Sequence, residues 1–200
     1  MAQTIENMIT SRVYANHRGW VFTPIHFLDL GNRDAIDQGL GRLTKTGTIR
    51  RLARGLYDYP IKHSDLGDLP PNYQRIAQAL AGRDNLKIQP SGAYAANLLG
   101  LTEQVPAKII FLTDGPNRKV QIDKRKIILK RTTPKNMATA GHLSGVVIQA
   151  LRHLGKNNVT DKTIQTLKKK LTKADKRQLI SNLRYAPAWI GTILRQLQNE

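Results

Sequence analysis

The chain has 200 residues with 32 Lys and Arg against 14 Asp and Glu, so its formal net charge is +18. This excess favours a polyanionic partner such as a nucleic acid. A hydrophobic content of 40% supports a folded core, and the absence of cysteine excludes disulfide scaffolds, thiolate nucleophiles and the commonest structural zinc sites. The chain start lacks the pattern of a signal peptide, and the apolar runs are too short to cross a bilayer. We therefore expect a cytoplasmic protein without a membrane partner.

The charge is unevenly distributed along the chain. Residues 1–60 contain 8 basic and 5 acidic residues, whereas residues 61–200 contain 24 and 9. Between the two segments, residues 61–71 are rich in turn formers and poor in periodic apolar positions. We therefore predict an N-terminal domain at 1–60, a linker at 61–71 and a basic domain at 72–200.

The first sixty residues have the element order of a winged helix-turn-helix. Thr4 caps a helix that continues to about residue 16, residues 19–22 form a strand, and Thr23 precedes a short helix at 24–30. Asn32 caps a third helix whose apolar positions 36, 40 and 43 share one face. Strands at 48–53 and 56–59 follow, joined by a tight turn at Arg54 and Gly55. A third helix followed by a basic hairpin is the arrangement that places a recognition helix in the DNA major groove.

The polar face of the third helix supplies the candidate base contacts, which are Asp34, Gln38 and Arg42. The candidate contacts to the DNA backbone, from the helix ends and the wing, are Asn32, Arg33, Lys45, Arg50, Arg51 and Arg54. The alternative is that this polar face is only solvated, as most outer helix faces are, or that the winged helix binds protein.

The sequence resembles the AbiEi-type antitoxins, the transcriptional-regulator components of type IV toxin-antitoxin, or abortive-infection, operons. The similarity lies in DAIDQGLGRL at 34–43, GTIRRLARGLYDYP at 47–60, QPSGAYAANLLGL at 89–101, QVPAK at 104–108 and FLTDG at 111–115. It covers residues 5–135. The resemblance implies a bacterial autorepressor whose winged helix binds inverted repeats in its own promoter. It also implies a cognate nucleotidyltransferase-like toxin, opposed through the C-terminal domain with no need for a stable complex.

The remainder of the chain predicts an α+β domain that ends in helices. Helices are expected at 73–82, 91–99, 143–154, 160–171, 173–183 and 187–197, and a strand at 86–88. Three further strands are expected at 108–113, 119–122 and 126–130, joined by turns at 114–117 and 123–124. These strands form the core of a second basic surface, made of Arg118, Lys119, Lys124, Arg125, Lys126, Lys130 and Arg131. The alternative is that these cations only protect strand edges from pairing.

No motif in the sequence indicates catalysis, a cofactor or a metal. His63, Asp65 and Asp68 are the nearest approach to a metal cluster, but they fall in the predicted linker without a frame to fix them. His142 and His153 are about 16 Å apart if they share one helix, too far to hold one ion. The rival interpretation is a protein-binding or RNA-binding module that neutralises the toxin by direct contact. An aromatic content of 6% disfavours the RNA version, because RNA recognition relies on stacking.

Overall fold

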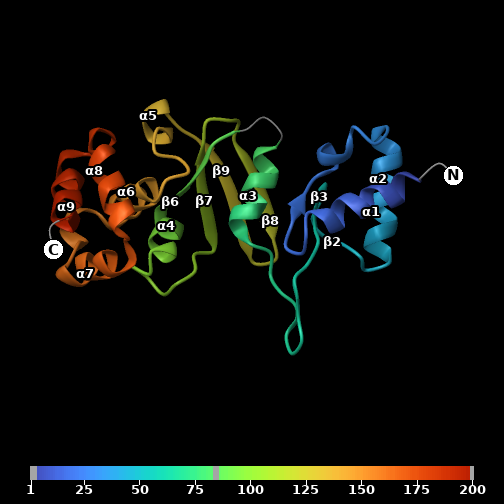
Figure 1. The fold of residues 1–200 in the computed structure, drawn as a ribbon, viewed down its shortest axis with the longest axis horizontal. Coiled ribbons are helices and arrows are strands. Elements are labelled where there is room, and N and C mark those ends of the chain that lie inside the picture. Colours follow the sequence, from blue (N-terminus) through green and yellow to red (C-terminus); the bar gives the residue numbers. More distant parts are fainter. Residues whose placement is uncertain (1–3, 83–85, 199–200) are drawn as a thin grey trace. The chain divides into compact units, whose positions relative to one another are not determined.

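The protein has a mixed α+β fold in two compact units (Figure 1). The structure is a computed structural model and describes residues 4–82 and 86–198. By their contacts, residues 1–85 group with residues 120–122 in the first unit, and residues 86–119 group with 123–200 in the second. This division falls between residues 85 and 86, whereas the sequence predicts the boundary at 61–71.

The first unit begins with two α-helices, a 3-10 segment and a small sheet. Helix α1 (Ile5–Ala15), strand β1 (Val21–Phe22), the 3-10 helix η1 (Pro24–Phe27) and helix α2 (Arg33–Lys45) are followed by strands β2 (Arg50–Ala53) and β3 (Leu56–Asp58). The sheet has the order β1-β3-β2, and both pairs are antiparallel. The predicted short helix at 24–30 is therefore a single 3-10 segment that ends at Phe27.

The starts of α1 and α2 follow from their capping residues. The backbone N–H of Asn7 donates to the Thr4 hydroxyl, and that of Ala35 donates to Asn32 Oδ1. Both predicted caps are confirmed. The helices close on a core that includes Ile9, Ile36 and Leu40, together with the aromatic rings of Phe22 and Phe27. The two rings meet edge to face with centroids 5.4 Å apart.

Residues 61–71 carry secondary structure that the sequence does not predict. Strands β4 (Lys62–His63) and β5 (Gly67–Asp68) pair in an antiparallel hairpin, with Lys62 opposite Asp68. Helix α3 (Tyr73–Ala81) follows, capped by Asn72, whose Oδ1 accepts from two backbone N–H groups. The segment is an ordered projection from the first unit and not an unstructured linker (Figure 1).

The second unit is built on a four-stranded sheet with the order β6-β7-β9-β8, although residues 120–122 of the edge strand β8 group by contacts with the first unit. Its strands are β6 (Ile88–Ser91), β7 (Lys108–Thr113), β8 (Arg118–Ile122) and β9 (Arg125–Arg131). Residues 114–117 connect β7 to β8 as predicted, but the two strands do not form a hairpin, because β7 pairs in parallel with β9. Those residues pass the end of β9 to reach the edge of the sheet, and β9 then returns between β7 and β8.

Strand β6 runs through Pro90, although the sequence predicts a strand that ends before this proline. Pro90 lies opposite Phe111 in the antiparallel β6–β7 pair. A proline has no N–H to donate, so it is tolerated where one side of the strand faces no neighbour. Strand β6 stands at the end of the sheet order, and this position accommodates Pro90.

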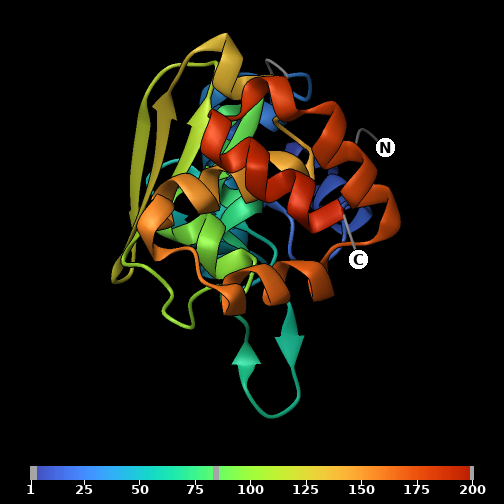
Figure 2. The same cartoon turned by 90° about the vertical axis from the view of Figure 1, so that its left-hand side faces the viewer.

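Helices complete the second unit and lie together on one side of its sheet (Figure 2). They are α4 (Gly92–Leu98), α5 (Pro134–Met137), α6 (Leu143–Leu154), α7 (Asp161–Lys170), α8 (Lys173–Ser181) and α9 (Ala188–Gln198), with short 3-10 segments η2 (Lys156–Asn158) and η3 (Leu183–Tyr185). The four helices predicted after residue 142 are confirmed within two residues at each end. Their shared core includes Leu151, Leu167, Leu179, Ile190 and Leu194.

The interior amide of Gln89 fixes the start of α6 against β6. With its amide oriented to satisfy both neighbours, the Gln89 nitrogen donates to the Thr139 carbonyl, and its oxygen accepts from the Val146 N–H, each at 3.1 Å. Gln89 is fully buried, so both bonds are shielded from water. Ser91 caps α4 by position only, because its hydroxyl donates to the Gln149 side chain and not to the backbone of α4.

Gly145 leaves the space that this Gln89 network occupies. A Cβ at this position would lie 2.5 Å from the Thr139 carbonyl oxygen and would overlap the end of the Gln89 side-chain amide. We therefore expect Gly145→Ala to lower the free energy of unfolding by about 1 kcal/mol or more, through overpacking. Urea titration followed by circular dichroism measures this. Gly41→Ala is the matched control, because a Cβ there meets nothing within 4 Å.

Candidate nucleic-acid interface

One face of α2 is buried and the opposite face is exposed, as the apolar spacing predicts. Ile36, Gly39, Leu40 and Leu43 are buried. Gly39 sits where α1 passes closest, since a Cβ there would lie 2.9 Å from Ile9 Cδ1. This contact orients α2 on α1 and turns its other face to solvent.

The predicted base-contact residues lie together on that solvent face. Asp34, Gln38 and Arg42 are all exposed and recur every four residues, so they form one row along the helix. Lys45 is also exposed and ends the row at the last helical residue. The row presents carboxylate, amide and guanidinium groups, which together can both donate to and accept from base edges.

Arg42 is held only loosely in the free protein. Its Nη1 lies 3.4 Å from Glu6 Oε2, and the Arg42 side chain remains 65% exposed. An exposed ion pair of this length contributes little to stability. Arg42 can therefore leave Glu6 for another acceptor at small cost.

Two of the predicted backbone contacts at the start of α2 have partners within the helix. Asn32 is the N-cap, and Arg33 Nε donates to Asp37 Oδ2 at 2.8 Å in an ion pair four residues apart. Both side chains are exposed, but the Asn32 oxygen is already accepting from the helix backbone. The structure thus gives Asn32 a local role that does not need DNA.

A cap substitution tests that role. Asn32→Ala removes the acceptor for the Ala35 N–H and is expected to lower the free energy of unfolding by about 1 kcal/mol, whereas Asn32→Asp should preserve most of it. Thermal unfolding of the two variants side by side gives the measurement. Equal losses for alanine and aspartate would show that the cap is not the source of the effect.

The three arginines of the predicted wing differ in their surroundings. Arg51 and Arg54 are exposed on β2 and on the turn that follows it. Arg50 instead makes a two-pronged ion pair with Asp58 of β3, at 3.0 Å from Nε to Oδ1 and 2.6 Å from Nη2 to Oδ2. Its side chain is 30% exposed and that of Asp58 is 2% exposed, so the pair is largely shielded from water.

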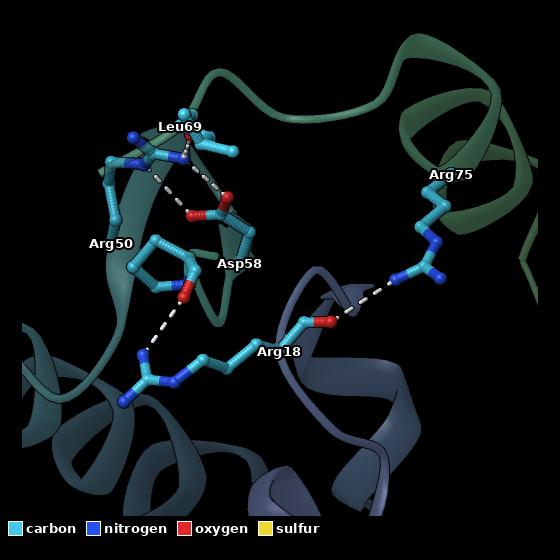
Figure 3. Close-up of polar contacts among 6 residues, drawn as sticks. Arg18, Arg50, Asp58, Leu69 and Arg75 are labelled. Carbon is cyan, nitrogen blue, oxygen red and sulfur yellow. Dashed lines mark hydrogen bonds and ion pairs between the residues drawn. The ribbon is translucent and has the colours of Figure 1, made fainter. Parts of the chain in front are cut away.

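Arg50 also ties the β2–β3 hairpin to Leu69, the last residue of the hairpin at 61–69. Its Nη2 donates to the Leu69 carbonyl at 3.0 Å (Figure 3). On the other side of the same segment, Arg18 Nη1 donates to the Pro60 carbonyl at 2.9 Å, and its guanidinium lies over the Tyr59 ring. These two arginines fix both ends of the 61–69 segment on the first unit, a role that the sequence does not reveal.

Asp58 is a buried acid whose ionisation is perturbed. Burial raises the pKa of Asp58 above its ordinary value, and the hydrogen bond and charge of Arg50 only partly counteract this. Because desolvation exceeds the attraction, the pair does not gain stability simply by being charged. It fixes the pairing of β2 with β3 at one point.

The second basic surface lies on β8 and β9 of the second unit. Lys119, Lys124, Lys130 and Arg131 are exposed, whereas Arg118, Arg125 and Lys126 are half-buried. Along β9, Lys126, Ile128 and Lys130 alternate with the buried Ile127 and Leu129, so the two lysines share one face. The structure therefore gathers most of the predicted cations on two neighbouring strands.

His63 and His142, considered above as possible metal ligands, make hydrogen bonds within the protein. Among the described residues, no three His, Cys, Asp or Glu side chains lie close enough together to hold a metal ion. His63 Nδ1 accepts from the backbone N–H groups of Asp65 and Leu66, at 3.2 and 3.4 Å. His142 precedes α6 and contacts Gln178. No helix in residues 4–82 and 86–198 is long and apolar enough to cross a membrane.

Comparison with known proteins assigns a family. The sequence matches the family described as "Family of unknown function (DUF6088)" over residues 8–179. The chain belongs to this family. The DUF6088 match extends over α1 to most of α8 and so includes the α2 face, the β2–β3 hairpin and the second basic surface.

Among solved structures, this DUF6088 chain is similar to "Crystal structure of RV2827C protein from Mycobacterium tuberculosis", with 16% sequence identity and a TM-score of 0.46. The similarity covers 100% of this chain and 78% of that chain. No curated protein matches the sequence.

Proposed function

We propose that the protein is a sequence-specific DNA-binding autorepressor and the antitoxin of a type IV toxin-antitoxin operon, and that it binds inverted repeats in its own promoter in the cytoplasm. The observation that carries the DNA-binding part is the exposed row of Asp34, Gln38 and Arg42 on α2, followed directly by the basic β2–β3 hairpin. Helix, strand, short helix, helix and two strands is the order of a winged helix-turn-helix.

In this proposal the residues of the first unit divide by role. Gln38 can bind adenine through its amide, Arg42 can make two hydrogen bonds to guanine, and Asp34 can accept from cytosine N4. Lys45, Arg51 and Arg54 neutralise phosphates on either side of the groove. Arg50 and Asn32, which the sequence assigns to the DNA backbone, also have structural roles, since Arg50 pairs with Asp58 and Asn32 caps α2.

The second basic surface adds affinity that is independent of DNA sequence. Its exposed lysines can release counterions from the phosphate backbone at any DNA sequence to which the first unit binds. The antitoxin part of the proposal rests on the resemblance to AbiEi-type antitoxins, which implies a nucleotidyltransferase-like toxin as the functional partner. The protein acts in this scheme by binding and not as an enzyme, and needs no cofactor.

The test is fluorescence anisotropy with the DNA upstream of the gene and with a scrambled duplex, each titrated at several salt concentrations. The proposal expects a gap of about a thousandfold between the two duplexes that persists at physiological salt. If the two curves coincide and weaken together as salt rises, the +18 charge acts alone. The protein-binding or RNA-binding alternative would then be pursued with the toxin.

A further inference from the structure

The hairpin at 61–69 extends from the first unit as an arm with an exposed apolar tip. We call residues 61–69 the hairpin arm. In Figures 1 and 2 its loop end reaches past the other elements of its unit. Leu66 at the tip is 72% exposed, and Ile61 at the base is 44% exposed. The other residues of the first unit therefore leave both side chains exposed to solvent.

The hairpin arm is ordered although it is exposed. The Leu69 N–H donates to the Ile61 carbonyl at 2.8 Å, and His63 Nδ1 receives the two N–H groups of the turn. Gly67, with a φ of 68°, takes the left-handed conformation that closes the turn. With Arg50 and Arg18 bonded to its two ends, the arm holds Leu66 at a fixed place.

An isolated two-stranded hairpin is marginally stable in water, and it becomes stable when another surface covers it. The charges of the arm indicate which surface. In a chain of net charge +18, residues 61–69 contain one lysine and two aspartates, so the arm has the opposite sign. Asp65 is next to Leu66, and Asp68 follows two residues later. Phosphates repel such a tip, whereas a basic protein surface with an apolar centre attracts it.

A surface of that description exists on the second unit. A groove of about 380 Å³ lies along the ends of β8 and β9. It is lined by Asn117, Arg118, Lys119, Ile128, Leu129 and Lys130. Ile128, which is half-buried, provides apolar contact area, and Lys119 and Lys130, both exposed, place cations beside it. The groove therefore has the complementary pattern to the arm, with an apolar side chain between charges of opposite sign.

We propose that the hairpin arm of one copy docks in this groove of a second copy of the same chain, with Leu66 on Ile128 and with Asp65 and Asp68 facing Lys119 and Lys130. Two copies that exchange arms in this way make the same contact twice, as a two-fold symmetric dimer does. The inference goes beyond the proposed function, because the contact needs no DNA.

Sedimentation equilibrium of the full chain without DNA tests the proposal. Because each contact is small, we expect a reversible dimer with a dissociation constant in the range of about 1 to 100 µM. Leu66→Ser, and separately Asp65→Lys with Asp68→Lys, should weaken dimerisation about tenfold or more, since each removes a central contact. Val105→Ser and Glu103→Lys are matched controls, because both positions are exposed and lie outside the arm and the groove.

Charge exchange then identifies the receiving surface. Lys119→Glu with Lys130→Glu should weaken the dimer as the arm variants do, and combining all four charge reversals should restore it. A wild-type chain that remains monomeric up to about 200 µM, well above that range, would overturn the proposal. So would a dimer that the arm variants leave unchanged, or a four-fold variant no better than its parents. Promoter affinity is measured separately, so the failure of DNA recognition would leave this result intact.

Discussion

Replacing Arg50 by methionine is expected to lower the free energy of unfolding of the first unit by about 3 kcal/mol at neutral pH, because it leaves a buried carboxylate without its partner. Asp58, with a side chain 2% exposed, would lose both hydrogen bonds from the guanidinium. Methionine retains most of the aliphatic volume, so the loss reports charge and not packing. Urea unfolding followed by Trp20 fluorescence, in a Trp189→Phe background, measures the first unit alone.

A second substitution separates the ion pair from a general effect on β2. Adding Asp58→Asn to Arg50→Met removes the stranded charge and should recover most of the lost stability. Arg51→Met is the matched control, since Arg51 is the exposed neighbour on the same strand and should change stability by less than about 0.5 kcal/mol. Similar small shifts for Arg50→Met and Arg51→Met would mean that the ion pair does not stabilise the β2–β3 hairpin.

The dependence on pH has a definite sign. Because burial raises the pKa of Asp58, the folded protein binds this proton more tightly than the unfolded chain does. The stability that protonated Asp58 contributes is therefore fully present below the unfolded pKa of about 4 and is lost as the pH rises through the folded pKa. Unfolding free energy of the wild type, taken relative to Asp58→Asn, should fall over this interval. In the Arg50→Met background the fall should be larger and continue to higher pH.

The pairing of Arg50 with Asp58 cannot be predicted from local sequence patterns. The positions of β2, β3 and the turn at Arg54 and Gly55 are predictable from residue types. A regular hairpin with that turn, in which Ala53 lies opposite Leu56, would place Arg51 opposite Asp58. Between Arg51 and Ala53 the register shifts, so that Arg50 lies opposite Asp58 instead. Because of this one irregular residue, Arg50 pairs with Asp58 and Arg51 is exposed. No residue type in the segment predicts the irregularity.

The strand order in the sheet of the second unit is also not predictable from local sequence patterns. Each of its strands lies near a predicted segment, because apolar alternation and turn residues act locally. The order β6-β7-β9-β8 depends on how the strands pack against the helices and on the return of β9 between β7 and β8. That choice is made by contacts distant in sequence, for which spacing gives no signal. The α2 face was predictable for the opposite reason, since a single helix period defines Asp34, Gln38 and Arg42 as one row.

Arg42→Ala is expected to reduce affinity for the upstream DNA by about 1–3 kcal/mol, roughly a tenfold to hundredfold loss, and to change affinity for a scrambled duplex little. The reason is geometric, because Arg42 is exposed in the middle of the polar row and is restrained only by the 3.4 Å contact with Glu6. Anisotropy titrations with both duplexes at matched salt give the two losses directly.

The matched control for Arg42→Ala is a cation on the second basic surface. Lys119→Ala should weaken both duplexes about equally and reduce the slope of log affinity against log salt by roughly one, because a phosphate contact releases one counterion wherever it forms. The two variants remove the same charge, so only the position of the cation differs between them. A loss for Arg42→Ala that is equal on both duplexes would assign Arg42 to the backbone and leave Gln38 and Asp34 as the remaining candidates for base recognition on α2.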